Sequence, residues 1–186
     1  MFLLLYSILF PIAFLLYLPF YLVHIFRRGG LSVDFWERIA IYTKAKRQRL
    51  AQLDHPIWIH AVSVGETVAA LTFIRRWREH APNQPFVFSA STSTGFATAC
   101  KKLPKDIVPI YCPIDCFFAV TRAMHAIRPA MLCIFEVEIW PNLIAAAKRN
   151  GAKVVLVNGR MSDHSSLGYA RWKTIFAPIF RSFDAI

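Results

Sequence analysis

The stretch IWIHAVSVGE, residues 57–66, runs from a continuous apolar segment into a turn that contains serine and glycine and ends on a carboxylate. A short apolar run followed by turn residues is typical of a strand that is buried on both faces, as in a parallel sheet covered by helices. Residues 67–80 then have a helical pattern. The segment therefore predicts the first strand and helix of a βαβ unit.

The same alternation continues through the rest of the chain. After the first run at 57–62, further β-rich runs lie at 86–90, 107–111, 131–135 and 153–157. Helical patterns follow them, in a short segment after Thr94 and then at 115–127, 140–150 and 164–180. Strands that alternate with helices of this length predict an α/β domain with a Rossmann-like parallel sheet, which we expect to occupy residues 55–186.

The N-terminal segment has the composition of a membrane anchor. Residues 2–26 contain no Asp, Glu, Lys or Arg, and about 20 apolar residues are enough to span the hydrocarbon core of a bilayer. A secretory signal would carry basic residues before its apolar core, whereas Arg27 and Arg28 come after it. We therefore expect residues 1–26 to form a retained anchor helix, while Pro11 and Pro19 leave open a segment that lies in the membrane interface.

Basic residues outnumber acidic ones, with 22 Lys and Arg against 11 Asp and Glu and a formal net charge of +11. Several of them follow the apolar segment, in a stretch at 27–54 that we expect to be a basic linker. Because basic residues stay on the cytoplasmic side of a membrane, this arrangement predicts a cytoplasmic domain and an N-terminus on the other side. A basic surface beside an anchor also predicts contact with anionic lipid headgroups.

Nucleic-acid binding is the rival interpretation of the positive charge. The sequence has no zinc spacing, RNA-binding sheet signature or helix-turn-helix pattern that would support it, and the apolar N-terminal segment argues against it. The four cysteines have no CxxC pairing, so we expect neither disulfides nor a metal site.

Polar clusters follow each of the five predicted strands. They lie at 63–66, 91–95, 112–115, 136–138 and 158–162. The ligand crevice of an open α/β sheet lies outside the carboxyl ends of its strands. We therefore expect these five loops to line one site.

The first cluster combines a possible base with a possible helix cap. Gly65 allows a tight turn, and Glu66 would emerge near the first turn of a helix, where the helix dipole holds a carboxylate ionised. Such a carboxylate can act as general base on an attacking hydroxyl. The spacing of Ser63 and Glu66 also fits a capping box, and the residues alone favour this structural interpretation. His60, on the preceding strand, is more commonly a core histidine.

The other clusters offer polar groups of different kinds. Ser91, Thr92, Thr94 and Gly95 supply hydroxyls and backbone N–H groups that can hold phosphate or sugar oxygens, although hydroxyl-rich helix caps are common.

Two carboxylates, Glu136 and Glu138, follow an apolar strand, and in an extended segment they would point to the same side. They could share a site with a cationic or hydroxyl ligand, or one could form a structural salt bridge; we favour function, because an ordinary core would not accommodate them. Arg160, near Asn158, is a candidate for binding an anionic group such as phosphate.

Taken together, these segments resemble the 3-deoxy-D-manno-octulosonic acid (Kdo) transferases of lipopolysaccharide synthesis. The resemblance lies in WIHAVSVGE (58–66), STSTG (91–95), YCPID (111–115), EVEIWPN (136–142) and NGRMS (158–162), which match the family in order and spacing. The short hydrophobic N-terminus and the basic segment after it also look like that family's.

The resemblance implies a glycosyltransferase of the GT-B type, with two Rossmann-like domains and an active site between them. It implies inverting, metal-independent transfer of Kdo from the donor CMP-Kdo to the lipid A precursor, without a cofactor, at the cytoplasmic face of the bacterial inner membrane. Glu66 matches the family's catalytic base on the acceptor hydroxyl. The resemblance places the following residues around the acceptor and the active cleft: Ser63, Gly65, Ser91, Thr92, Thr94, Gly95, Asp115, Glu136, Glu138, Trp140, Asn158, Arg160 and Ser162.

The chain departs from the family pattern in two ways. Ser93, Gly159 and Met161 stand where the family usually has proline, alanine and leucine. The family's second domain, which carries most of the CMP-Kdo site, is also missing, so we expect an acceptor-binding half that by itself binds the acceptor weakly and transfers no sugar. The alternative is a non-catalytic, membrane-attached lipid-binding module of the same fold.

Overall fold

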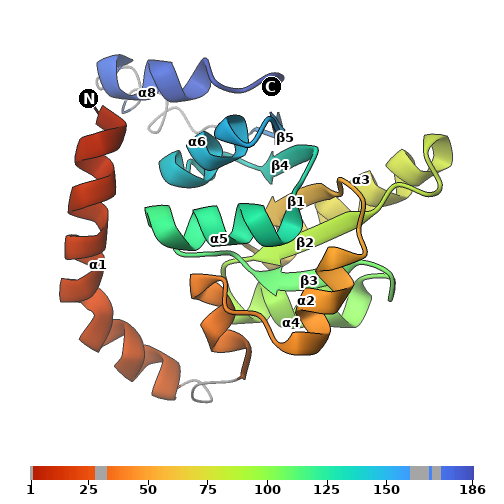
Figure 1. Cartoon of the computed structure of the whole chain (residues 1–186), viewed down its shortest axis with the longest axis horizontal. Helices are drawn as coiled ribbons and strands as arrows, with labels where there is room; N and C mark the ends of the chain where they lie inside the picture. Colours follow the sequence, from red (N-terminus) through yellow and green to blue (C-terminus); the bar gives the residue numbers. More distant parts are fainter. Residues whose placement is uncertain (1, 28–32, 160–167, 169–172) are drawn as a thin grey trace.

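Five apolar segments form the parallel sheet that the sequence predicts (Figure 1). They are β1 (Ile57–Ala61), β2 (Phe86–Ala90), β3 (Val108–Tyr111), β4 (Met131–Phe135) and β5 (Lys153–Val157). The strand order is β3-β2-β1-β4-β5, and every pair is parallel. The order reverses between β1 and β4, the place where open α/β sheets bind ligands. The computed structural model describes residues 2–27, 33–159, 168 and 173–186.

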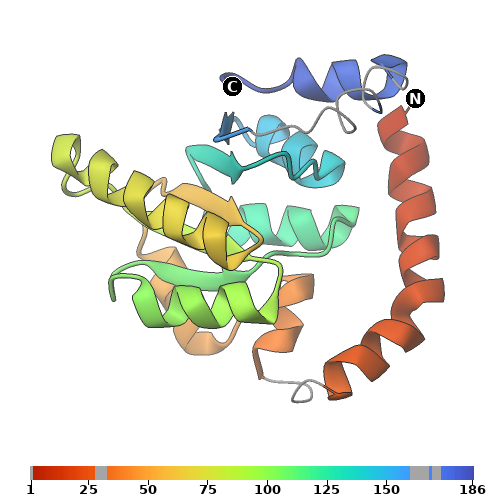
Figure 2. The ribbon, with the colours of Figure 1, turned by 180° about the vertical axis from the view of Figure 1, so that it is seen from behind.

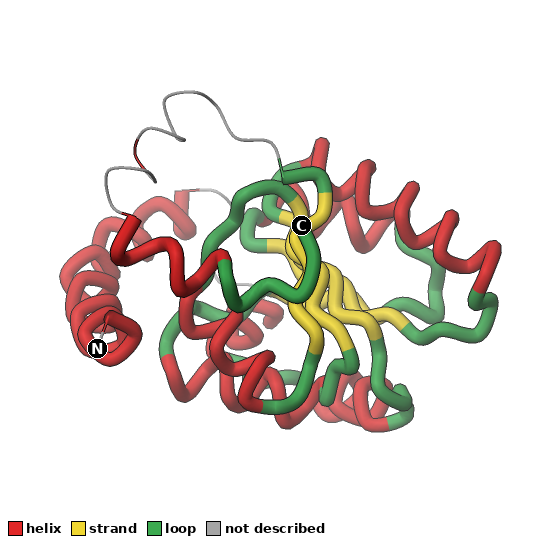
Figure 3. Tube along the Cα trace, turned by 90° about the horizontal axis from the view of Figure 1, so that it is seen from above, coloured by secondary structure: helices red, strands yellow, loops and turns green. Residues whose placement is uncertain are grey.

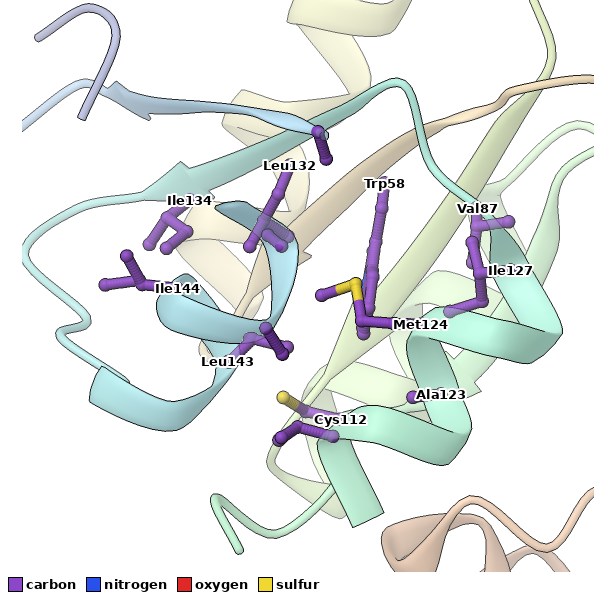
Figure 4. Close-up of a cluster of buried hydrophobic side chains, with 14 of the residues drawn as sticks. Trp58, Val87, Cys112, Ala123, Met124, Ile127, Leu132, Ile134, Leu143 and Ile144 are labelled. Carbon is purple, nitrogen blue, oxygen red and sulfur yellow. The ribbon is translucent and has the colours of Figure 1, made fainter. Parts of the chain in front are cut away.

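Helices cover both faces of the sheet, which explains why the strands are continuous apolar runs (Figure 3). One face packs against α3 (Val64–His80) and α4 (Ser93–Lys102). The other packs against α5 (Phe117–Ile127) and α6 (Pro141–Arg149). Figure 4 shows the second core, where Trp58 of β1 lies among side chains from both helices.

The segment expected to be a basic linker is partly folded. It forms η1 (Val33–Ile39) and α2 (Lys44–Ala51). Tyr42 and Leu50 are buried in the core on the α5 and α6 side of the sheet. Glu37 is also buried; it pairs with Lys46 and accepts the backbone N–H of Tyr111 at 3.0 Å, which covers the edge strand β3. The few apolar residues that make these contacts lie among many basic ones. The sequence therefore shows no hydrophobic periodicity that would have predicted η1 and α2.

The chain ends beside the opposite edge of the sheet. α8 (Lys173–Phe180) confirms part of the helix predicted at 164–180; residues 164–167 and 169–172 lie outside the described residues. Asp184 accepts the N–H of Val154 at 2.8 Å and pairs with Lys148 at 2.7 Å. Ala185 bridges to β5 in parallel. These contacts hold the last residues against β5.

The N-terminal segment forms the predicted helix, α1 (Phe2–Arg27), with Pro11 and Pro19 inside it. Residues Phe2–Phe20 have a mean hydropathy of 2.2, and none of the residues in this window is fully buried inside the protein. By length and composition α1 could cross a membrane. Figures 1 and 2 show it running along one side of the domain, with its first turn beside α8.

Candidate active site

The loops after β1 and β2 are held together at the carboxyl ends of the strands. The Thr92 hydroxyl donates to the carbonyl of Val62 at 2.6 Å and accepts the N–H of Gly95 at 3.1 Å. A Cβ at Gly95 would lie 2.7 Å from the Val62 carbonyl oxygen, so only glycine fits there. The other hydroxyls of this loop, on Ser91 and Thr94, remain at least partly accessible beside the start of α4.

Glu66 forms the capping box that its spacing predicts. Its backbone N–H donates to the Ser63 hydroxyl at 3.2 Å, and its Oε1 accepts the Ser63 N–H at 3.1 Å. Its Oε2 accepts the Val62 N–H at 2.7 Å. Each carboxylate oxygen has two lone pairs, and among the described residues one lone pair on each oxygen has no hydrogen-bond donor. The carboxylate is thus fixed in one orientation at the switch point of the sheet, and it is 5% exposed.

One further carboxylate, Glu138, lies close enough to Glu66 for the charge of Glu66 to affect its pKa. Burial, followed by the carboxylates of Glu66 and Glu136, raises the pKa of Glu138. Glu136 has a φ of 57°, which places its backbone in the left-handed region and contradicts the extended conformation expected for this segment. The turn ends β4 at once and still keeps both glutamates at the strand-end edge. Three carboxylates therefore share this edge.

His60 belongs to β1 and is fully buried. Its Nδ1 is 3.0 Å from the Ser89 hydroxyl, which also accepts the indole N–H of Trp58 at 2.8 Å. Burial lowers the pKa of His60 to about 4, although the Glu66 carboxylate acts in the opposite direction. Its Nε2 has no hydrogen-bond partner among the described residues, and its ring packs edge-on against Trp140, 6.5 Å away. The position is that of a core histidine with one unpaired nitrogen.

Asp115 has a structural role that the sequence did not reveal. Its carboxylate accepts the backbone N–H groups of Asn142 at 3.0 Å and Leu143 at 2.7 Å, and so caps the start of α6 from another loop. Tyr6 of α1 donates a third hydrogen bond at 2.9 Å. Burial raises the pKa of Asp115 to about 6 in spite of these donors. Because both carboxylate oxygens already accept hydrogen bonds, Asp115 has a structural role, in which it fixes the start of α6 next to the site.

Arg38 is a cation that the sequence pattern did not single out, because it lies in the segment expected to be a linker. Its guanidinium donates to the Ser91 carbonyl at 2.9 Å and lies 4.2 Å above the Tyr111 ring. The charges of Arg38 and Glu138 both act on the Cys112 thiol, which places them near the same strand ends. In the sequence, Arg38 is one basic residue in a short segment of apolar, acidic and basic residues, and nothing else indicates its position near the site.

The last predicted cluster is described only in part. Asn158 lies exposed after β5, with a left-handed φ of 54°. Arg160 and Ser162 lie outside the described residues. The edge that the structure brings together is therefore built from the loops after β1, β2 and β4, with Arg38 of η1 beside them.

Comparison with known proteins identifies the family. The family model described as 3-deoxy-D-manno-octulosonic-acid transferase (kdotransferase) matches residues 34–186. A 3-deoxy-D-manno-octulosonic acid transferase of Rickettsia felis is 35% identical over 130 residues, which are 70% of this chain and 28% of that protein. One of Rickettsia bellii is 31% identical over 94% of this chain and 41% of its own length. A probable mitochondrial transferase of Arabidopsis thaliana is 34% identical over 63% of this chain and 26% of its own length.

The extent of these matches defines what the chain corresponds to. It spans about 28% of the Rickettsia felis relative. The matched residues contain the whole described sheet and the strand-end edge with Glu66. The chain therefore belongs to the Kdo transferase family, and it corresponds to the N-terminal region of that family.

Proposed function

We propose that this chain provides the acceptor side of a transferase that moves Kdo from CMP-Kdo to the lipid A precursor, with Glu66 as the general base. The observation that carries the proposal is the fixed carboxylate of Glu66 at the switch point of the sheet, held by the N–H groups of Val62 and Ser63. The donor CMP-Kdo would be bound by a region that corresponds to the remainder of the longer relatives.

The proposed reaction consists of three events. The acceptor hydroxyl attacks the anomeric carbon of Kdo from the face opposite to CMP, its proton passes to Glu66, and the bond to the CMP phosphate breaks with its electron pair on the phosphate oxygen. The transfer inverts the anomeric centre and needs no metal ion. A base must lie within hydrogen-bond distance of the proton that it takes. We propose that the hydroxyls of Ser91 and Thr94 and the guanidinium of Arg38, near the same strand ends, would hold the sugar and phosphate oxygens of the acceptor.

Glu66 suits the role of base better than Glu138. The pKa of Glu138 is raised by burial and by its acidic neighbours, so it keeps a proton at a higher pH than an ordinary glutamate and suits hydrogen-bond donation to the acceptor. Each oxygen of the Glu66 carboxylate accepts one backbone N–H group, and in the part of the chain that the structure describes it keeps a second lone pair for a proton.

Membrane attachment through α1 completes the proposal. The acceptor is itself a membrane lipid, so a site held at the cytoplasmic face of the bacterial inner membrane meets a substrate that rarely leaves the bilayer. The formal net charge of +11 would favour contact with anionic headgroups and with the phosphates of the acceptor.

A chimera tests the function. This chain replaces the matching region of the Rickettsia bellii relative, and transfer of Kdo from CMP-Kdo to the lipid A precursor is measured in detergent. The proposal predicts acceptor-dependent transfer by the chimera. A chimera that folds and binds the precursor but transfers no sugar would instead favour the non-catalytic lipid-binding module.

A further inference from the structure

α1 carries two kinds of apolar side chain along its length. One side carries a row of aromatic rings in contact, Phe2, Tyr6, Phe10 and Phe14, with successive centroids 6.1, 5.3 and 6.3 Å apart. The large apolar side chains of α1 that are exposed, each between 52% and 74%, are aliphatic apart from one phenylalanine and one tyrosine. They are Leu4, Leu5, Ile8, Leu9, Ile12, Leu15, Leu16, Tyr17, Phe20 and Val23.

The first turns of α1 are bonded to the domain through polar groups. Tyr6 donates to the buried carboxylate of Asp115 at 2.9 Å, and the Ser7 hydroxyl donates to the side-chain oxygen of Asn142 at 2.6 Å. Phe2 packs against the core on the α5 and α6 side of the sheet. The N-terminal end of the helix therefore lies beside α6, as Figure 2 also shows.

The other end of α1 is tied to the same domain by the chain itself. Arg27 and Val33 are six residues apart, a distance that an extended chain covers in at most about 22 Å. Val33 begins η1, which packs on β3. From Tyr6 to Arg27 a helix rises about 31 Å, close to the thickness of the hydrocarbon core of a bilayer. A helix that crossed the membrane would need these two ends on opposite sides.

We infer that α1 does not span the membrane but lies in one leaflet, with both of its ends on the side of the domain. Its exposed apolar side chains would enter the boundary between headgroups and acyl chains to a depth of about 5–10 Å. The inference differs from the expectation that the N-terminus lies on the other side of the membrane. That expectation was based on the charges at the two ends of the segment. The sequence does not reveal that Tyr6 and Ser7 form hydrogen bonds with the domain. The inference rests on the membrane attachment in the proposed function.

The surroundings of the N-terminal turn fit a lipid with an anionic headgroup. A cavity of about 490 Å³ lies between α1, α6 and α8. Its walls are largely apolar, from Phe2, Leu3 and Ile144, and they end on Arg149 and on Lys148, which also pairs with Asp184. Apolar walls next to two basic residues complement an acyl chain that is joined to a phosphate. A leaflet that contains anionic lipids would therefore supply acyl chains to contact the exposed apolar side chains of α1 and phosphate groups to contact Lys148 and Arg149.

A cross-link in the membrane tests the docking of α1. The whole chain is expressed in bacteria with Ser7→Cys and Asn142→Cys in a Cys100→Ser background, and inner-membrane vesicles are oxidised. The two cysteines should form a disulfide that keeps the N-terminal and central fragments joined after proteolysis. The matched control, Leu16→Cys with Asn142→Cys, should form none. Absence of the first cross-link in the membrane fraction would overturn the inference.

A second measurement, which leaves the core unchanged, decides the side of the N-terminus. A protease site is placed before Met1 of the otherwise unaltered chain. Protease added to inverted vesicles should remove the extension, whereas protease added to intact spheroplasts should not. Cleavage in spheroplasts alone would show a spanning helix and overturn the inference. A chain found wholly in the soluble fraction would instead refute membrane attachment itself, which distinguishes the two failures.

Discussion

Ser63 and Glu66 hold each other at the start of α3, where the Ser63 hydroxyl accepts the N–H of Glu66 at 3.2 Å and the Glu66 carboxylate accepts the N–H of Ser63 at 3.1 Å. The same carboxylate is the proposed base. One side chain thus serves the stability of the helix and the chemistry of the site, and variants of the two residues can separate these roles.

Replacement of the capping hydroxyl should affect stability more than transfer. Ser63→Ala leaves the Glu66 carboxylate in place but removes the acceptor for its N–H, so we expect the free energy of unfolding to fall by about 1 kcal/mol. Denaturant unfolding of the chain in detergent measures this change. Transfer by the chimera that carries Ser63→Ala should stay within a few-fold of the parent. A complete loss of transfer in a folded Ser63→Ala chimera would contradict the separation of roles.

Gly65 and Gly95, which lie in the first turns of α3 and α4, should respond differently to a methyl group. Gly95→Ala places a Cβ 2.7 Å from the Val62 carbonyl oxygen, a backbone atom that cannot move freely. We expect a loss of about 1–3 kcal/mol in the free energy of unfolding. Gly65→Ala is the matched control, because its nearest neighbour would be the Ser63 Oγ at 3.9 Å. That variant should be neutral or more stable, by up to about 1 kcal/mol, since alanine favours a helix. Equal losses in both variants would refute the role given to Gly95.

The buried Asp115 should make stability depend on pH in an unusual direction. Its pKa is raised from 3.8 to about 6 in the folded protein. Between these values the folded state binds more protons than the unfolded state, so stability should fall as pH rises from about 4 to about 6. Asp115→Asn should remove this fall, and the difference between wild type and variant in unfolding midpoint, measured across this pH range, isolates the contribution of Asp115. Parallel curves for the two proteins would contradict the assignment.

His60 should remain neutral in mildly acidic solution. Its pKa is lowered to about 4 by burial, so its imidazole should show no midpoint near the ordinary value of about 6.5. Nuclear magnetic resonance of the imidazole nitrogens against pH measures this directly, with His60→Gln to assign the signal. Protonation of His60 near pH 6.5 would show that the residue is open to solvent.

Much of the sheet could be predicted from the sequence. The strands at 86–90, 131–135 and 153–157 have the predicted bounds. Continuous apolar runs mark such strands clearly because helices cover both sides of the sheet. η1 and α2 were missed since their contacts depend on a few residues, such as Leu50, within a basic stretch.

The site was predictable where neighbouring residues define it. The spacing of Ser63 and Glu66 was enough to predict the capping box. Asp115 could not be understood in this way, since its partners Asn142 and Leu143 lie 27 and 28 residues away along the chain. The left-handed turn at Glu136 and the position of Arg38 likewise depend on the folded sheet.

The removal of the Glu66 carboxylate is the most direct test of the proposal that Glu66 is the general base. Glu66→Gln in the chimera with the Rickettsia bellii relative keeps the size of the side chain, and the matched control Glu79→Gln changes an exposed glutamate of the same helix that pairs with Arg76. We expect Glu66→Gln to reduce the rate of Kdo transfer by roughly 10² to 10⁴-fold, while Glu79→Gln transfers at the parent rate. A folded Glu66→Gln chimera that transfers Kdo as fast as the Glu79→Gln control would contradict the account.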